Sequence, residues 1–302
     1  MSTLYALSDI HLSYAPNRAA LTLLRPHPND GLILAGDMGE TLSHLRLAFE
    51  AATSLFARVW WVPGNHELYS MPSSANTEAG DALRGEAKYN ACVAIAREYG
   101  VLTPEDEFVV WQGDDGSETL VCPIFTLYDY SFRPSDVPRE GALAWAMEEG
   151  IEATDEHLLH PDPYATRDEW CAALCERFEA KLTAARQKHP KIPFVIVNHW
   201  PIKEALIYLR LVPRFRIWCG TKLTEDWPER FGASVVVTGH LHIRRTDWKE
   251  GVRYEEVSLG YPRQWKECRE SGKDVNDMMR EILPGPKKPE GGNAATVWRV
   301  YG

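Results

Sequence analysis

The chain has 302 residues, of which 44% are hydrophobic and 25% charged, and its formal net charge is −10. This composition is typical of a soluble globular protein, and no apolar run approaches the roughly 18 residues of a membrane span. The first residues lack the basic start and apolar stretch of a signal peptide, and the six cysteines include no Cys-x-x-Cys pair. We therefore expect one cytoplasmic domain over 1–302, with free thiols and no membrane span.

Negative charge is concentrated in the segment 128–170, which has eleven acidic residues and three arginines. A protein that binds a nucleic-acid duplex usually presents a basic surface, because its affinity comes from neutralising phosphates. Nucleic acid is therefore disfavoured as a substrate. The segment also has an irregular composition between predicted strands, and we hypothesise that it is an acidic insert or lid at the rim of a binding cleft.

Three short apolar runs in the first part of the chain each predict a buried strand, and polar side chains follow each of them. The runs are 3–8, 32–35 and 59–62, and the side chains that follow are Asp9, His11, Asp37, Asn65 and His66. A helix is predicted over 41–57 from its apolar spacing, with Thr41 as its N-cap. Strands alternating with a helix favour crossover connections and a central buried sheet.

The rest of the chain continues this alternation. We expect helices at 81–99, 140–149 and 166–188, and a hairpin of 108–111 with 119–125 around the turn 113–116. Strands are predicted at 194–197 and 234–237, followed by Asn198-His199 and by Gly239-His240-Leu241-His242. Closing strands are expected at 252–258 and 296–301, and an exposed loop at 284–293.

Five predicted strands thus end in polar side chains, and the carboxyl ends of such strands are where open α/β folds bind ligands. Each motif alone has an ordinary structural explanation, such as a turn or a helix cap. Together they place two aspartates, an asparagine and four histidines at one edge. So many buried polar groups without partners would be costly, and their number suits two divalent cations that share a carboxylate.

These ordered motifs closely resemble those of the calcineurin-like metallophosphoesterase family. The motifs are Asp9-Ile10-His11, Gly36-Asp37, Gly64-Asn65-His66-Glu67, Asn198-His199 and Gly239-His240-Leu241-His242. The resemblance does not cover the segment 128–170 or the residues after about 264. It implies an α/β fold, a four-layer αββα sandwich of two mixed β-sheets, with the metal site at the C-terminal ends of the strands.

The resemblance also implies how two divalent metal ions would be bound. The first would be held by Asp9, His11, Asp37 and His242, and the second by Asp37, Asn65, His199 and His240. Asp37 would bridge the two ions, whereas Glu40 is not expected to be a ligand. Nitrogen and oxygen ligands without thiolate suit Mn, Fe or Zn.

The implied activity is a metal-dependent phosphoesterase that hydrolyses a phosphomonoester or a small phosphodiester. In such a centre, metal-bound hydroxide attacks phosphorus directly. His66 would be the catalytic residue that protonates the leaving oxygen. The substrate would be a phosphorylated small molecule or a phosphoprotein. Two alternatives remain, a nuclease acting on DNA or RNA ends and a non-catalytic metal-stabilised binding protein.

Substrate contacts are harder to predict. Arg210, Arg214 and Arg216 form a basic cluster after His199, and Tyr128 could line a pocket. The alternative is that the arginine stems pack on the surface and the tyrosine lies in the core. Further candidates are Tyr69, Tyr130 and Arg263.

Overall fold

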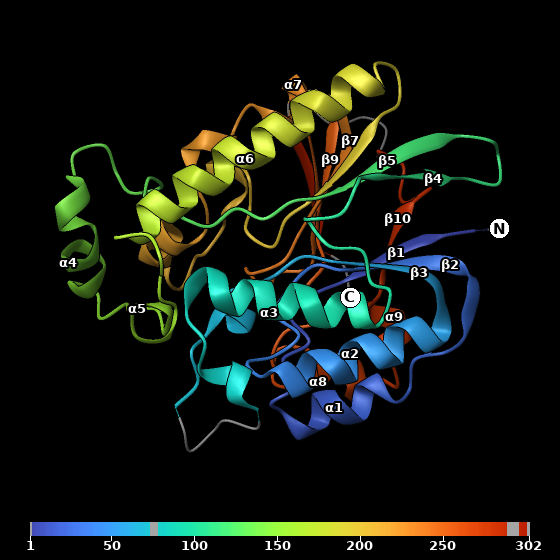
Figure 1. The fold of residues 1–302 in the computed structure, drawn as a ribbon, viewed down its shortest axis with the longest axis horizontal. Coiled ribbons are helices and arrows are strands. Elements are labelled where there is room, and N and C mark those ends of the chain that lie inside the picture. The colour runs from blue at the N-terminus through green and yellow to red at the C-terminus, as the bar shows by residue number, and fades with distance from the viewer. Residues whose placement is uncertain (1, 73–77, 289–295, 301–302) are drawn as a thin grey trace.

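Two β-sheets stacked face to face form the centre of the protein (Figure 1). The computed structural model describes residues 2–72, 78–288 and 296–300. The strands are β1 (Leu4–Leu7), β2 (His27–Leu34), β3 (Phe56–Trp61), β4 (Val109–Gln112), β5 (Glu118–Pro123), β6 (Phe194–Val197), β7 (Ala233–Thr238), β8 (Arg245–Lys249), β9 (Val252–Glu256), β10 (Arg280–Leu283) and β11 (Thr296–Val300). They form a four-stranded sheet, β10-β1-β2-β3, and a seven-stranded sheet, β11-β8-β9-β7-β6-β5-β4.

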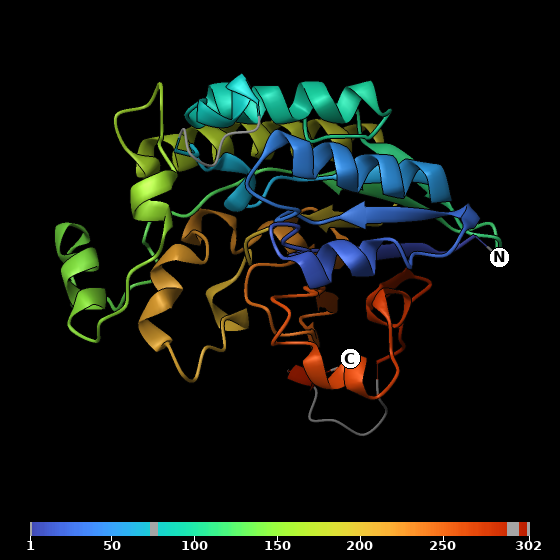
Figure 2. The same ribbon diagram turned by 90° about the horizontal axis from the view of Figure 1, so that it is seen from below.

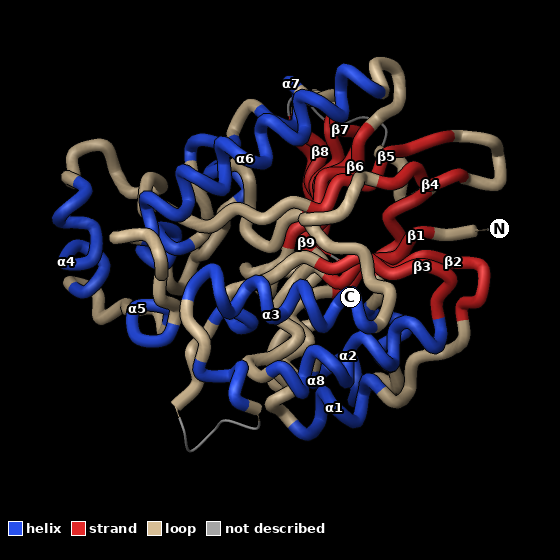
Figure 3. Tube along the Cα trace, in the orientation of Figure 1, coloured by secondary structure: helices blue, strands red, loops and turns tan. Residues whose placement is uncertain are grey.

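Helices cover the outer faces of both sheets, as the two ribbon views show (Figures 1 and 2). On the four-stranded sheet lie α1 (Ala15–Leu21), α2 (Leu42–Leu55) and α3 (Gly85–Glu98), and on the seven-stranded sheet lie α6 (Arg167–Lys188) and α7 (Trp227–Arg230). The remaining α-helices are α4 (Ala142–Met147), α5 (Asp155–Leu158), α8 (Lys266–Glu270) and α9 (Val275–Met278). The strands therefore lie between helical layers (Figure 3), which confirms the predicted four-layer αββα sandwich.

Both sheets are mixed, as predicted, and their parallel strands bear the polar motifs. β1, β2 and β3 are parallel to one another, as are β5, β6, β7 and β9, whereas β10, β4, β8 and β11 pair antiparallel. An isolated parallel bridge joins Ser8, just after β1, to Ser258, just after β9. The two sheets therefore meet at the edge formed by the carboxyl ends of their strands.

Successive residues of the central strands face two different parts of the core, because side chains alternate along a strand. In β3, Trp60 packs between the sheets, whereas Val59 and Trp61 belong to the core under the helices. In β6, Val195 and Val197 join Trp60 between the sheets. Strands buried on both faces are continuous apolar runs, and for this reason they were recognisable in the sequence.

Most predicted elements are present, with shifted ends. The side chains of Thr41 and Thr166 accept hydrogen bonds from the third residues of α2 and α6, and so cap them as N-cap residues do. The predicted helix over 81–99 was wrong at its start, because residues 79–82 form a separate 3-10 helix and α3 begins at Gly85. β2 begins earlier than expected, at His27.

Some elements were not predicted. β8 and β10 are short and rich in charge. Arg245 and Asp247 pair within β8, and Arg280 of β10 pairs with Glu255 of the other sheet. The strand predicted at 296–301 is β11, although residue 301 lies outside the described part. In the predicted loop, residues 284–288 have no regular structure beyond a bend, and 289–293 are not described. Other short pieces are 3-10 helices at His66–Leu68, Ala79–Ala82, Arg139–Gly141, Glu204–Leu206, Pro213–Trp218 and Lys222–Thr224.

The acidic segment 128–170 contains α4 and α5 and extends into α6, and in Figure 1 its two short helices lie to one side of the sheets. Several of its acids form ion pairs, among them Asp168 with Arg139 and Glu156 with Arg167. That the segment forms a lid, and that the chain is a single domain, stay predictions. None of the described helices is both long and apolar enough to cross a lipid bilayer.

Replacing Trp60 with alanine should lower the free energy of unfolding by about 3–5 kcal/mol, because it removes a large buried side chain from between the sheets. Trp60 is 1% exposed and its ring lies 5.9 Å from that of Trp111. Urea unfolding followed by circular dichroism measures the change, with Leu223→Ala, at a half-exposed position, as the control. Equal losses in the two variants would contradict this description of the core.

Candidate metal centre

All seven predicted ligands lie in loops that directly follow five parallel strands. Asp9 and His11 follow β1, Asp37 follows β2 and Asn65 follows β3. On the other sheet, His199 follows β6, while His240 and His242 follow β7. Both sheets therefore contribute side chains to the same edge.

The backbone at this edge is held in an uncommon conformation. Seven non-glycine residues of the described chain have positive φ, and five of them are predicted ligands: Asp9 (52°), His11 (47°), Asp37 (59°), His240 (73°) and His242 (54°). A residue in a sparsely populated region costs about 1–3 kcal/mol and persists only where the surroundings impose it. Strain of this kind concentrates at functional sites, and here it coincides with the predicted ligands.

Two motif glycines allow the loops to approach one another. A Cβ atom on Gly64 would lie 2.1 Å from Oδ1 of Asp37, and one on Gly239 would lie 2.3 Å from Oδ2 of Asp9. Both distances are far below van der Waals contact, so any larger residue would push a predicted ligand away. These glycines are thus required by the close approach of two loops.

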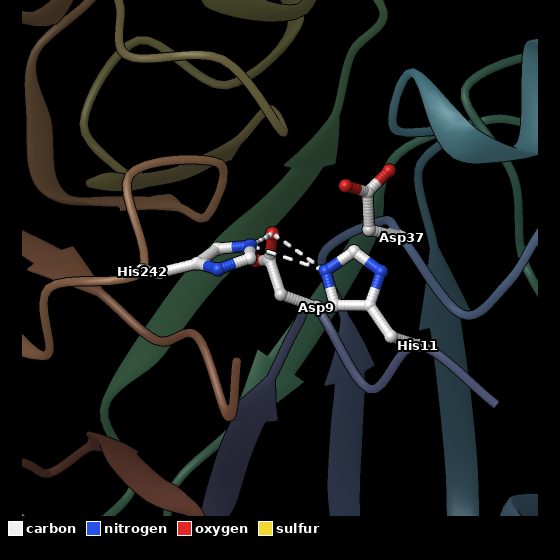
Figure 4. A group of neighbouring side chains, drawn as sticks. All are labelled: Asp9, His11, Asp37 and His242. Carbon is white, nitrogen blue, oxygen red and sulfur yellow. Dashed lines mark hydrogen bonds and ion pairs between the residues drawn. The ribbon is translucent and has the colours of Figure 1, made fainter. Parts of the chain in front are cut away.

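The four residues predicted to hold the first metal ion converge (Figure 4). Ligand atoms of Asp9, His11, Asp37 and His242 all lie within 4.8 Å of one another. Nε2 of His242 lies 2.9 Å from Oδ1 of Asp9 and 3.1 Å from Nε2 of His11. Two imidazole nitrogens and carboxylate oxygens gathered within this distance suit a divalent cation.

The residues predicted to hold the second ion are also neighbours. Nε2 of His199 lies 3.5 Å from Oδ2 of Asp37, and Nδ1 of His240 lies 3.2 Å from Oδ1 of Asn65. Nδ1 of His199 lies 2.9 Å from the carbonyl oxygen of Ala35, which leaves Nε2 as the free nitrogen. Apart from this ion-pair contact with Asp37, that buried nitrogen has no partner among the described residues. An imidazole nitrogen and a carboxylate oxygen that face each other in this way suit a divalent cation.

The imidazole groups have pKa values shifted in opposite directions. Burial lowers the pKa of His11 and of His240 to about 3, and neighbouring imidazoles add to the effect. Burial also lowers the pKa of His199, but the carboxylates of Asp37 and Asp9 outweigh it and raise the value to about 10. Metal binding requires neutral imidazole and therefore releases the proton that His199 holds at neutral pH.

A buried glutamate, Glu67, joins two of the ligand loops. Its carboxylate accepts hydrogen bonds from the backbone amides of Asp37 (2.9 Å), Met38 (2.7 Å) and Gly64 (2.8 Å). The loop after β2 is thereby fixed to the loop after β3. Glu67 belongs to the Gly64-Asn65-His66-Glu67 motif, but this role was not predicted, because its partners are backbone groups.

Asp9 and His242 are oriented by neighbours that the sequence did not indicate. Ser258 donates a hydrogen bond to Oδ2 of Asp9 (2.8 Å), as does the backbone amide of His240 (3.1 Å). Oε1 of Gln264 lies 2.7 Å from Nδ1 of His242. Such outer partners fix the tautomer and direction of a metal ligand, and they lie too far away in sequence to be recognised as part of a motif.

Asp9, His11, Asp37 and His242 together form the Asp/His cluster. His66 lies beside this cluster and contacts Glu40. Its Nδ1 is 3.0 Å from Oε1 of Glu40, and its Nε2 is 3.9 Å from Oδ2 of Asp37. Burial lowers the pKa of His66, but the two carboxylates outweigh burial and raise the value to about 9. The imidazole is therefore protonated at neutral pH and suited to donate a proton, with Glu40 as the partner that fixes its ring.

The residues predicted to contact the substrate do not join the proposed metal ligands. Tyr128 is fully buried in the core, Arg216 is paired with Glu204, and Arg214 with the glutamates 148 and 149. Arg210 contacts the hydroxyl of Tyr208. No described hydrogen bond or ion pair joins these four side chains to the Asp/His cluster, so their role in substrate binding stays a prediction. Among the weaker candidates, Tyr69 and Tyr130 form internal hydrogen bonds, and Arg263 is exposed.

Replacing Glu40 with glutamine should lower the pKa of His66, because a carboxylate that stabilises the imidazolium is removed. An NMR titration of the metal-free protein measures this pKa from the imidazole resonances of His66. The midpoint should lie near pH 9 in the wild type and at lower pH in the variant. The raised pKa also means that the interaction of the His66 imidazolium with the carboxylates of Asp37 and Glu40 stabilises the metal-free fold fully below about pH 6.5. The stabilisation is lost as the pH rises through about 9. An unchanged titration in Glu40→Gln would refute the pairing, and Glu50→Gln, on the surface of α2, is the control.

Comparison with known proteins adds independent information. The sequence profile described as calcineurin-like phosphoesterase matches residues 2–244. An acyl-carrier-protein phosphodiesterase, PptH of Mycobacterium tuberculosis, is 41% identical over 293 residues, which cover 96% of this chain and 86% of that protein. The crystal structure of the M. tuberculosis phosphopantetheinyl hydrolase PptH superimposes with a TM-score of 0.86 at 39% identity, over 96% of this chain and 99% of the other. The chain therefore belongs to the calcineurin-like phosphoesterase family and is a metal-dependent phosphoric ester hydrolase.

Proposed function

We propose that this enzyme hydrolyses the phosphodiester that links a phosphopantetheinyl group to an acyl carrier protein. The observation that carries the proposal is the convergence of Asp9, His11, Asp37 and His242 in a fold whose relative at 41% identity is an acyl-carrier-protein phosphodiesterase. Among the substrates expected from the sequence, the activity of this relative favours a diester over a phosphomonoester. It also favours a protein-linked substrate over a small molecule.

Two divalent ions form the proposed centre, with the ligand sets given above. Bound there, they would polarise the phosphoryl group and lower the pKa of the attacking water. Asp37 suits the shared position because its Oδ1 accepts the backbone amide of His66 at 2.9 Å, while its Oδ2 faces Nε2 of His199. The chain has no thiolate in either proposed set, which supports Mn, Fe or Zn, with manganese as the metal to test first.

His66 is the proposed general acid. In the metal-free protein the carboxylates of Asp37 and Glu40 raise the pKa of its ring, and Glu40 contacts Nδ1 at 3.0 Å and keeps the ring in one orientation. The leaving oxygen of a carrier-protein ester is an alkoxide, which departs slowly unless it is protonated. The assignment therefore predicts that His66 matters most for substrates with poor leaving groups.

Charge and thiol chemistry bear on the remaining expectations. Arg214 and Arg216 are neutralised by acidic partners, which argues against a nuclease, because nucleic-acid affinity depends on free cationic groups. The alternative of a non-catalytic binding protein is set aside, because the chain belongs to a family of hydrolases. All six cysteines are free thiols, which supports the proposed cytoplasmic location.

Incubation of phosphopantetheinylated acyl carrier protein with the enzyme and Mn²⁺ should release the prosthetic group, which intact-mass spectrometry detects as the unmodified carrier protein. Bis-p-nitrophenyl phosphate should be hydrolysed faster than p-nitrophenyl phosphate, and a chelator should stop both reactions. Release of inorganic phosphate from the monoester alone would contradict the diesterase proposal.

Replacing Asp37 with alanine should reduce kcat/KM by at least a thousandfold and remove the metal-dependent rise in Tm, because one side chain joins both ions to the fold. Metal content per chain and Tm with and without Mn²⁺ are the measurements. Asp30→Ala, at a partly buried acid in the first half of β2, is the control. Two ions retained by Asp37→Ala would contradict the bridging role.

A further inference from the structure

The acidic segment 128–170 is attached to the loop that carries Asn65. An isolated antiparallel bridge joins Tyr69 to Leu159, and the backbone amide of Ser70 donates to the carbonyl of Leu158 at 2.9 Å. Asp155, the first residue of α5, lies against the same loop with 2% exposure. The segment is therefore in contact with the proposed metal centre through its short helix.

Asp155 contacts one proposed ligand directly. Its Oδ1 accepts hydrogen bonds from Nδ2 of Asn65 at 2.9 Å and from the hydroxyl of Tyr69 at 2.7 Å. The hydroxyl of Tyr69 in turn accepts from the same Nδ2 at 3.0 Å. The amide group of Asn65 thus has both of its donor contacts on the side of α5.

These contacts decide which way the amide of Asn65 points. Oδ1 of Asp155 is the acceptor in both contacts, so the NH₂ group of Asn65 faces Asp155 and its carbonyl oxygen faces away. The carbonyl oxygen Oδ1 is the atom that lies 3.2 Å from Nδ1 of His240. Only this orientation presents an oxygen to a cation, since an amide NH₂ group cannot bind one.

Asp155 is itself held firmly by Arg167 of α6. The guanidinium donates to the backbone carbonyls of Asp155 (2.7 Å) and Leu159 (2.9 Å), which lie at the two ends of α5. It also pairs with Glu156 at 2.8 Å and donates to the hydroxyl of Tyr130 at 2.9 Å. The position of α5, and with it that of Asp155, is therefore determined by a buried network within the acidic segment.

We infer that Asp155 is a positioning residue for the second metal ion, acting through the amide of Asn65, and that the acidic segment is in this way a structural part of the metal centre. The inference rests on the proposed dinuclear function. It assigns to α5 a task that differs from that of a lid: the segment orients a ligand from behind. Loss of an outer partner of this kind typically weakens metal binding by about 10–100-fold.

Metal binding to the chelator-stripped protein tests the inference without any activity assay. Equilibrium dialysis with Mn²⁺ should give two sites in the wild type. Asp155→Ala should weaken the second site by at least about tenfold and leave the first unchanged. Asp155→Asn keeps an acceptor near Oδ1 and should lose less. Glu152→Ala, at an exposed acid of the same segment that contacts His157, should bind as the wild type does.

A double-mutant cycle separates positioning from a general effect on folding. If Asp155 acts through Asn65, then Asp155→Ala should have no further effect on the second site in an Asn65→Ala background. Equal weakening of both sites, an unchanged second site, or an equal effect with and without the Asn65 side chain would each overturn the inference. If Asp155→Ala does not fold, Asp155→Leu, which fills the space of the side chain without offering an acceptor, takes its place in the cycle with the same criteria.

The wild type distinguishes this inference from the proposed function. Fewer than two bound ions in the wild type would refute the dinuclear centre itself. Two ions in the wild type, with Asp155→Ala binding both at wild-type affinity, would leave the centre intact and refute only the role of Asp155.

Discussion

The arrangement of the site depends on one buried carboxylate. Glu67 accepts hydrogen bonds from three backbone amides in two loops, and these loops contain Asp37, the proposed bridging residue, and Asn65, a proposed ligand. A carboxylate can accept several hydrogen bonds at once, and in a dry interior each of them is strong. The side chain thus anchors the two loops, because both bond to the same buried group. The ends of strands β2 and β3 determine where these loops begin, and Glu67 holds the two loops together.

Around this anchor, the protein concentrates groups that are unfavourable by themselves. Buried carboxylates and imidazoles lie within a few ångströms of one another, the backbone of five proposed ligands has positive φ, and Nε2 of His199 has no partner beyond its ion-pair contact with Asp37. Each feature costs free energy in the absence of a cation. The large apolar core between and outside the sheets offsets these costs.

The fold class and the inventory of the site were predictable because both depend on local patterns. Continuous apolar runs indicate strands buried on both faces, as at Phe194–Val197, and short motifs directly after such runs indicate residues at one edge. The support of the site was not predictable. Gln264 lies 22 positions after His242, and Asp155 lies 90 positions after Asn65. These contacts arise from tertiary packing and have no periodicity. The charged strands β8 and β10 were missed for a similar reason, because the ion pairs of Arg245 with Asp247 and of Arg280 with Glu255 compensate their polarity only in the folded state.

The pairing of β1 with β10 has a consequence for how the chain may be shortened. The family profile ends at residue 244, yet Leu4 pairs with Leu283, so the strand that leads to Asp9 and His11 is an interior strand only because of residues near the C-terminus. Without β10, β1 would become an edge, with unpaired amides and carbonyls along a row of apolar side chains. Such an edge is a template on which another molecule can add a strand. A fragment that retained every proposed ligand and general acid would thus be prone to aggregate through the strand that leads into its metal centre.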